Sequence, residues 1–132
     1  MTRRELREHI FKMLFCVEFY QQEQVPEQLE SYFDRYESIE EKDRGYLMDK
    51  AGSVIEKITE LDTKIDEIAQ GWKVKRMGNV DKTIIRLALY EILYEENVPT
   101  KVAINEAVEI AKIYGGDDSP AFINGILAKL VS

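Results

Sequence analysis

One segment, from Val80 to Glu96, limits the possible folds more than any other part of the chain. Its apolar side chains fall on nearly every side of a helix, and they are Ile84, Ile85, Leu87, Ala88, Leu89, Ile92 and Leu93. A helix with so little polar surface is buried on most sides, and we therefore expect it at the centre of the fold. Asn79 is its predicted N-cap, and the break at residues 97–99 contains Pro99, which cannot continue a helix.

Most of the other apolar residues recur at spacings of three and four, which is typical of helices with one buried face. No run alternates apolar and polar residues for long enough to predict a sheet. The sequence therefore predicts an all-α fold, a single compact domain of about seven helices over residues 1–132. The further helices are expected near residues 4–20, 26–36, 41–60, 65–69, 104–111 and 120–130.

Composition excludes several classes of protein. With 45% hydrophobic and 33% charged residues, the chain has the composition of a globular domain and not of a disordered one. The only cysteine, Cys16, cannot form an internal disulfide, which favours a reducing compartment. No apolar run approaches the roughly 20 residues that span a bilayer, and the charged N-terminus lacks the apolar stretch of a signal peptide. We therefore expect a cytoplasmic protein with no membrane partner.

Residues with catalytic potential are few. His9 and Cys16 are the single histidine and cysteine. Their spacing on one helix separates them by about 10 Å, which is too far for a catalytic pair. Neighbouring carboxylates such as Asp117 and Asp118 are typical of solvated turns, and no glycine-rich phosphate loop occurs. We therefore predict that the protein is not an enzyme and has no catalytic residue, metal site or cofactor.

The net charge of −7 conceals an uneven distribution. Residues 18–70 contain 15 acidic and 6 basic residues, a net −9, whereas residues 1–17 are +2 and residues 72–86 are +4. Charges are screened beyond about 8–10 Å at cellular salt, so a local basic surface can still attract a polyanion. The negative total therefore does not exclude a nucleic acid as partner.

Three arginines, Arg3, Arg4 and Arg7, lie at the start of the first predicted helix, where Arg3 and Arg7 share a face. Arginine binds phosphates through paired hydrogen bonds and stacks on bases. Phe15 lies farther along the same helix, and aromatic rings stack on the bases of single-stranded RNA. The pattern fits an RNA-binding face. The alternative is a solvated helix start with Phe15 in the core.

Three segments carry a resemblance to a known family. The first is the start of the chain, RRELREHIFKMLF, and the second is VDKTIIRLALYE at residues 80–91. The most specific is VPTKVAINEAVEIAK at residues 98–112, followed by Gly115, by Asp118 and Ser119, and by FINGIL at residues 122–127. In this order they resemble the family of the transcription antitermination factor NusB, over nearly the whole chain and most weakly over residues 20–70.

The resemblance implies an all-helical protein of two helical sub-bundles packed together, which acts as an adaptor and not as an enzyme. Members of the family bind single-stranded boxA RNA of ribosomal RNA leader transcripts, together with NusE, which is also a small-subunit ribosomal protein. The pair helps to assemble other Nus factors on RNA polymerase, so that transcription resists termination. Some members form homodimers when RNA and NusE are absent.

The resemblance also implies roles for individual residues. The positions that match RNA-binding positions of the family are Arg3, Arg4, Arg7, Phe15, Asp118 and Phe122. Phe15 stands where many members have tyrosine, so stacking is retained and a hydroxyl hydrogen bond is lost. Asp118 would repel phosphate, so we expect it to stabilise a helix start and to restrain RNA affinity. Asp81 matches an acidic position that faces the basic NusE. Glu5 and Glu8, interleaved with the arginines, imply modest RNA affinity without NusE.

Several interpretations remain open beside this one. Trp72 is predicted to be a core residue between the halves and not a stacking surface. Lys82 and Arg86 are equally able to pair with Glu residues of neighbouring helices. One rival function is a helical adaptor that binds peptides without RNA, which the acidic segment favours. The other is a detached counterpart of the NusB-like domain that precedes RNA cytosine methyltransferases, and without a cofactor-binding module we expect no methylation by this chain alone.

Overall fold

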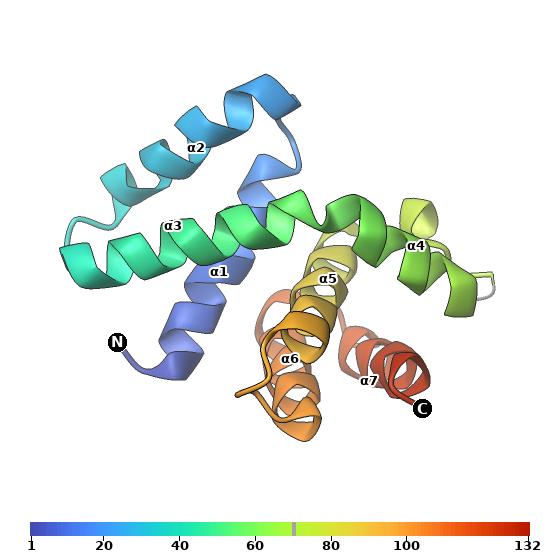
Figure 1. The fold of residues 1–132 in the computed structure, drawn as a ribbon. Helices are drawn as coiled ribbons and strands as arrows, with labels where there is room; N and C mark the ends of the chain where they lie inside the picture. Colours follow the sequence, from blue (N-terminus) through green and yellow to red (C-terminus); the bar gives the residue numbers. More distant parts are fainter. Residues whose placement is uncertain (70) are drawn as a thin grey trace. The chain divides into compact units, whose positions relative to one another are not determined.

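The computed structural model describes residues 1–69 and 71–132. These residues contain seven α-helices, three short 3₁₀ helices and no strand (Figure 1), which confirms the all-α prediction. The chain divides into two compact units, Met1–Ile55 and Glu56–Ser132. The helices are α1 (Arg3–Val17), α2 (Val25–Tyr32), α3 (Glu41–Glu56), α4 (Ile58–Ile68), α5 (Asn79–Tyr94), α6 (Thr100–Tyr114) and α7 (Ser119–Leu130).

The first unit is built from α1, α2 and α3. Helix α1 packs on α2, and a hydrogen bond of 2.7 Å between His9 Nδ1 and the Tyr32 hydroxyl joins the two helices. Tyr36 stacks on Tyr32 with ring centroids 4.8 Å apart. Arg44 of α3 donates a hydrogen bond of 2.7 Å to Glu30 of α2. Polar and aromatic contacts therefore join the helices of this unit in addition to its apolar core.

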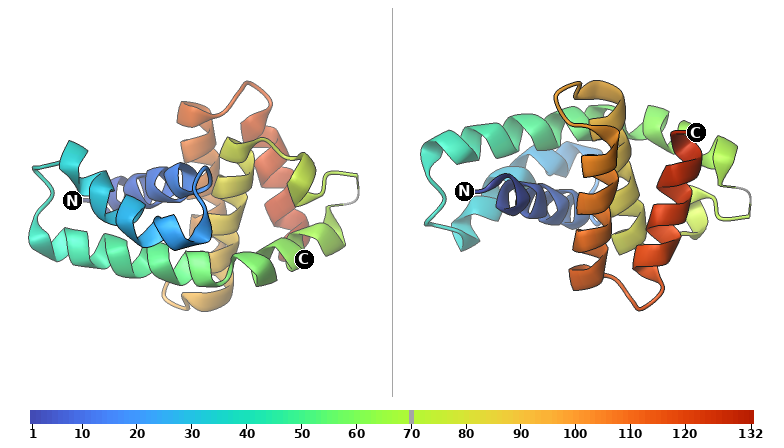
Figure 2. Two further views of the ribbon diagram at one scale, coloured as in Figure 1. Left: turned by 90° about the horizontal axis from the view of Figure 1, so that it is seen from above. Right: turned by 90° about the horizontal axis from the view of Figure 1, so that it is seen from below.

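In the second unit α5 is the central helix. It contacts α4, α6 and α7, and α6 also packs along α7 (Figures 1 and 2). The largest apolar side chains of α5 that are almost completely buried are Ile84, Ile85, Leu87 and Leu89. This confirms the expected burial of the segment, with two exceptions. Leu93, in the last turn, is 41% exposed, and the carboxylic acid Glu91 is fully buried.

The break within residues 41–69 lies at Lys57 and not at residues 61–64, between the helices predicted near 41–60 and 65–69. Lys57 has φ −101° and ψ 3°, which separates α3 from α4. Leu61 is fully buried within α4, and Asp62 pairs with Arg86 of α5. Within the regular helix α4, Leu61 is thus buried and Asp62 pairs with Arg86, so tertiary contacts override the sequence signal for a break at this point.

Two helix ends also differ from the prediction. Helix α1 ends at Val17 instead of about residue 20, because the chain forms turns over residues 18–20. Asn79 is the first residue of α5 and not its N-cap, a position that Gly78 occupies in an extended conformation. In the part of the chain that the structure describes, no helix is long and apolar enough to cross a membrane.

Candidate functional site

The three predicted arginines occupy the start of α1. Arg3 and Arg4 are exposed and Arg7 is half-buried. Residues four apart on a helix lie on the same face, so Arg3 and Arg7 emerge one above the other, with Arg4 beside them. The structure thus concentrates three guanidinium groups in a short length of regular helix, as the sequence predicts.

A capping box holds this helix start. The Thr2 hydroxyl accepts a hydrogen bond of 3.1 Å from the Glu5 N–H, and the Glu5 carboxylate accepts one of 2.8 Å from the Thr2 N–H. The pKa of the Glu5 carboxyl is lowered first by its hydrogen bond with the Thr2 backbone N–H and then by the interaction of the same carboxyl with the Thr2 side chain. Glu5 therefore has a structural role in capping, although its negative charge remains among the arginines.

A line of aromatic rings continues from the arginines along α1 and into the turn that follows it. Arg3, Arg7, Phe11, Phe15 and Phe19 follow one another at steps of four residues. The Phe15 ring centroid lies 6.1 Å from that of Phe11 and 5.4 Å from that of Phe19. Phe11 is buried, Phe15 is half-buried and Phe19 is 63% exposed. Phe15 also lines a hollow of about 300 Å³ between α1 and α2, so it is only partly a core residue.

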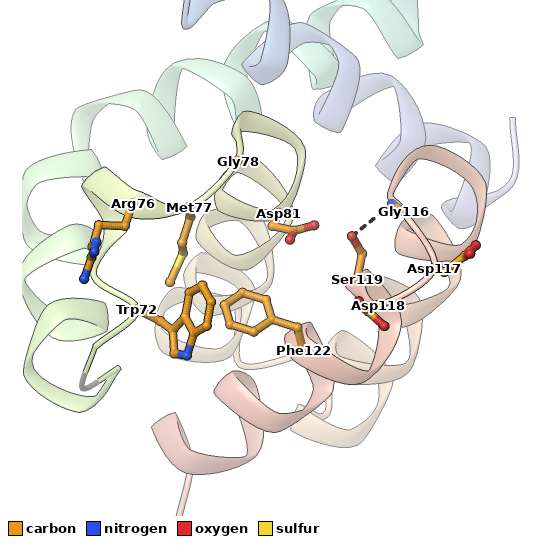
Figure 3. A pocket seen from close by; sticks show the side chains of 10 residues that line it. All are labelled: Trp72, Arg76, Met77, Gly78, Asp81, Gly116, Asp117, Asp118, Ser119 and Phe122. Atoms are coloured by element: carbon orange, nitrogen blue, oxygen red, sulfur yellow. Dashed lines mark hydrogen bonds between the residues drawn. The ribbon is translucent and has the colours of Figure 1, made fainter.

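The second unit contains a pocket of about 420 Å³ (Figure 3). Its walls come from the segment before α5, the first turn of α5, and the α6–α7 loop with the start of α7. The residues that line it are Trp72, Arg76, Met77, Gly78, Asp81, Gly116, Asp117, Asp118, Ser119 and Phe122. The pocket therefore brings together three of the predicted residues, Asp81, Asp118 and Phe122.

Trp72 and Phe122 form an aromatic pair at one side of the pocket (Figure 3). Their ring centroids are 5.6 Å apart, in an edge-to-face arrangement with 68° between the planes. Trp72 is 58% exposed, so the prediction that it is a core residue is wrong. Gly71, with φ +80°, turns the chain after α4, and the Trp72 N–H bonds to the Ala69 carbonyl at 2.9 Å. The indole follows this turn to the surface.

Three carboxylates lie around the same pocket, those of Asp81, Asp117 and Asp118. Asp81 is half-buried in the first turn of α5. Asp118 is the N-cap residue of α7, but its carboxylate makes no capping hydrogen bond, so the predicted stabilisation of the helix start is limited to its charge near the helix dipole. The Ser119 hydroxyl accepts a hydrogen bond of 3.1 Å from the Gly116 N–H, which holds the loop in place.

Arg86, the last residue of the basic segment 72–86, does not contribute to a basic surface. Its Nε and Nη2 atoms donate hydrogen bonds of 2.7 Å each to the two carboxylate oxygens of Asp62. The pair joins α4 to α5, and the Arg86 side chain is buried. The alternative that Arg86 pairs with a neighbouring helix is therefore right, although the partner is Asp62 and not a glutamate. The exposed cations of the segment include Lys73, Lys75 and Arg76.

His9 and Cys16 occupy different surroundings on α1. Burial lowers the pKa of His9, and the charge of Lys12 lowers it further. Cys16 is half-buried and lines the hollow beside Phe15. Among residues 1–69 and 71–132, no group of three or more His, Cys, Asp or Glu side chains is placed to hold a metal ion.

The predicted residues fall into two sets, one in each unit. Arg3, Arg4, Arg7 and Phe15 lie along α1 in the first unit, whereas Asp81, Asp118 and Phe122 surround the pocket of the second. The exposed ring of Trp72 is the part of this pocket that sequence reasoning missed. The available signal was its position between Gly71 and Lys73, since a turn between polar neighbours often lies at the surface.

Comparisons with known proteins agree on one family. The model of the NusB family matches residues 4–132. The transcription antitermination protein NusB of Agathobacter rectalis is 52% identical over 129 residues, which cover 98% of each chain. A solved structure of NusB from T. maritima has a TM-score of 0.88 at 35% identity and covers 98% of this chain and 90% of that one. A crystal structure of the antitermination factors NusB and NusE in complex with dsRNA shares the fold at 19% identity, with a TM-score of 0.82 and coverage of 97% and 94%.

Proposed function

Because this chain belongs to the NusB family of transcription antitermination proteins, we propose that it is an adaptor that binds single-stranded boxA-type RNA of ribosomal RNA leader transcripts together with NusE. Its action is assembly and not catalysis, since the family is one of antitermination factors and not of enzymes. The RNA-bound pair then helps to build an antitermination complex with other Nus factors on RNA polymerase, in the cytoplasm.

The observation that carries this proposal is the arginine cluster at the start of α1. Arg3, Arg4 and Arg7 are concentrated there in a chain whose total charge is −7. A cluster of guanidinium groups on one helix attracts phosphates locally, and its match to the family's RNA-binding start supports this use. Phe15 extends the same helix with a ring that is available for stacking.

The second unit supplies the other proposed contacts. Phe122 offers an aromatic ring to an RNA base, Asp118 borders the RNA, and Asp81 faces NusE. The half-buried carboxylate of Asp81 suits a basic partner. A chain of the same fold has been crystallised with NusE and dsRNA, which supports this combination of partners. A homodimer of this chain in the absence of RNA and NusE is part of the proposal.

A titration of labelled RNA tests the function directly. Fluorescence anisotropy of a boxA-type RNA is measured against increasing concentrations of the protein, alone and with purified NusE. We expect a complex that weakens as salt is raised and that is tighter with NusE, because two proteins then contribute contacts to one RNA. An RNA of the same length and scrambled sequence is the control.

The same titration separates this function from its rival. A helical adaptor that binds peptides without RNA would bind NusE but leave the RNA anisotropy unchanged. Family membership does not favour that rival. Failure to bind either RNA, with and without NusE and at low salt, would contradict the proposed function.

A further inference from the structure

One wall of the pocket in the second unit is aromatic, and its indole, Trp72, is not buried in the core. Trp72 is 58% exposed, and its ring contacts that of Phe122 near the start of α7. Exposed tryptophan is costly in water unless a partner covers it, because its large apolar area remains hydrated. An exposed indole beside a second ring is the arrangement on which a flat aromatic ligand can stack.

The size of the pocket suits a small planar group. Its volume of about 420 Å³ falls within the range of sites for small molecules. Met77 adds an apolar side chain next to the indole, while Asp81 and Ser119 face the pocket from α5 and α7 (Figure 3). The combination of an apolar wall with a few polar groups is typical of sites that orient a ligand.

The charges around the pocket decide which part of an RNA would enter it. The carboxylates of Asp81, Asp117 and Asp118 repel phosphate. They are hydrogen-bond acceptors only, so they favour a group that donates. The exocyclic amino group of cytosine, adenine or guanine is such a donor, and carboxylates accept from the amino group of cytosine. Arg76 is a cation among the residues that line the pocket, so it attracts phosphate to this side of the unit.

We infer that Trp72 and Phe122 form a stacking site for one unpaired nucleobase that carries an exocyclic amino group, and that the carboxylates of the pocket select it against uracil. This inference rests on the proposed function, and it assigns to Trp72 a role that the resemblance does not give it. The donor of uracil, N3–H, lies between two carbonyl oxygens that carboxylates repel, whereas the amino group of cytosine has C5–H on one side and can donate there to a carboxylate without a second acceptor nearby.

The single tryptophan of the chain makes the test direct. Trp72 fluorescence is recorded while oligocytidylate of about 12 nucleotides, a length within single-strand site sizes, is titrated at low salt. Stacking of a base on the indole quenches its emission, and no other tryptophan contributes a background. Oligouridylate of the same length should bind about 5-fold to 10-fold more weakly and quench less, given the usual cost of one lost base contact.

Substitutions then locate the effect. Trp72→Leu should lower the affinity for oligocytidylate about 5-fold to 100-fold, as measured by anisotropy of labelled RNA, whereas Trp72→Phe retains a ring and most of the affinity. Tyr94→Leu removes another exposed ring of the same unit outside the pocket and should have little effect. Asp118→Asn, which leaves the proposed NusE contact of Asp81 unchanged, should reduce the preference for oligocytidylate over oligouridylate, because a carboxamide both donates and accepts hydrogen bonds.

The outcomes distinguish this inference from the proposed function. Normal RNA binding by Trp72→Leu, or RNA binding without any change in Trp72 emission, overturns the stacking site and leaves the function intact. Quenching by NusE alone and not by RNA overturns it as well, because the pocket would then be a protein contact. Equal affinity for the two oligonucleotides overturns the selection by carboxylates. Absence of oligocytidylate binding by the wild-type protein overturns the stacking site, whereas the proposed function itself fails only if boxA-type RNA is not bound even with NusE.

Discussion

The two units of this protein present different chemistry on different kinds of surface. In the first unit, three arginines stand on the start of the open helix α1, and the rings of Phe15 and Phe19 follow them. In the second, two rings line a pocket whose rim carries carboxylates. The first arrangement suits the phosphates of a nucleic acid, and the second suits a base.

This difference explains how a chain with a negative net charge can still offer surfaces that suit RNA. Phosphate attraction needs only a local group of cations, because screening isolates it from distant charges. In the pocket of the second unit, the carboxylates repel phosphates, but an uncharged base can still stack on the rings of Trp72 and Phe122. The net charge of −7 therefore opposes indiscriminate binding of RNA. It opposes less strongly the binding of phosphates at the arginines of α1 and of a base in the pocket.

The largest expected effect is on stability, and it compares one arginine–carboxylate pair from each unit. In the second unit the buried Arg86 pairs with Asp62, and Asp62→Ala would remove both charge-assisted hydrogen bonds of this pair from the buried guanidinium. We expect the free energy of unfolding to fall by about 3–5 kcal/mol, measured by urea denaturation. The matched change in the first unit, Glu30→Ala at the exposed pair with Arg44, should cost less than about 1 kcal/mol. Equal losses of unfolding free energy in Asp62→Ala and Glu30→Ala would show that the buried pair contributes no more to stability than the exposed one.

The next effect tests the arginines of α1. Replacing Arg3, Arg4 and Arg7 together with Ala should weaken RNA binding about 100-fold, as expected from the loss of several charge-assisted contacts. The salt dependence should become shallower by about 2 in log–log slope. Far-UV circular dichroism should show native helix content.

A charge-matched control separates this result from a general change of net charge. Lys42, Lys64 and Lys101 are exposed and lie outside both candidate surfaces. Their joint replacement with Ala removes the same charge and should change RNA affinity only slightly. An equal loss in the two triple variants, or unchanged affinity in the arginine variant, would refute the assignment of phosphate binding to α1.

A smaller effect is expected at the wall of the pocket. A Cβ at Gly115 would lie 2.6 Å from the Ser119 Cβ and Oγ atoms and 2.9 Å from the Ala111 carbonyl oxygen. Gly115→Ala should therefore shift the α6–α7 loop and lower the melting temperature, at a cost of about 1–3 kcal/mol. At the adjacent Gly116 a Cβ meets nothing within 4 Å, and Gly116→Ala should be nearly neutral. Similar melting temperatures for both variants would show that the close approach is not required.

The smallest effect is a dependence on pH that belongs to the first unit. The pKa of His9 is lowered in the folded protein, first by burial and then by the charge of Lys12. Its contribution to stability is therefore present above the unfolded value near 6.5 and is lost as the pH falls from there toward the folded pKa. Urea unfolding at about pH 7.5 and pH 5.5 should show a smaller pH-dependent loss in His9→Gln than in the wild type. Identical losses would assign the pH dependence to other groups.

The helical architecture follows from features that the sequence displays openly. The spacing of apolar residues predicts the seven helices, and the nearly continuous apolar surface of residues 84–89 predicts the central position of α5. The burial of Glu91 and the break at Lys57 were not predictable in this way. Both depend on contacts between helices, as the pairing of Asp62 with Arg86 illustrates.

The residues of the candidate site likewise divide into those that local sequence places together and those that tertiary packing brings together. The arginines of α1 are neighbours in the sequence, so a helix prediction is enough to place them together. Trp72 and Phe122 are brought together only by the packed second unit, and hydrophobicity alone predicts burial for an indole. The resemblance indicated Asp81, Asp118 and Phe122 singly, and the structure adds that they line one pocket.

The capping box at Thr2 and Glu5 has a thermodynamic consequence for any ligand of α1. It fixes the backbone of the first turn, which at an uncapped terminus would fray. A frayed segment loses conformational entropy when a ligand orders it, at roughly 1–2 kcal/mol per residue. The arginines of α1 stand on a backbone that is already ordered, so association leaves mainly their side chains to be immobilised.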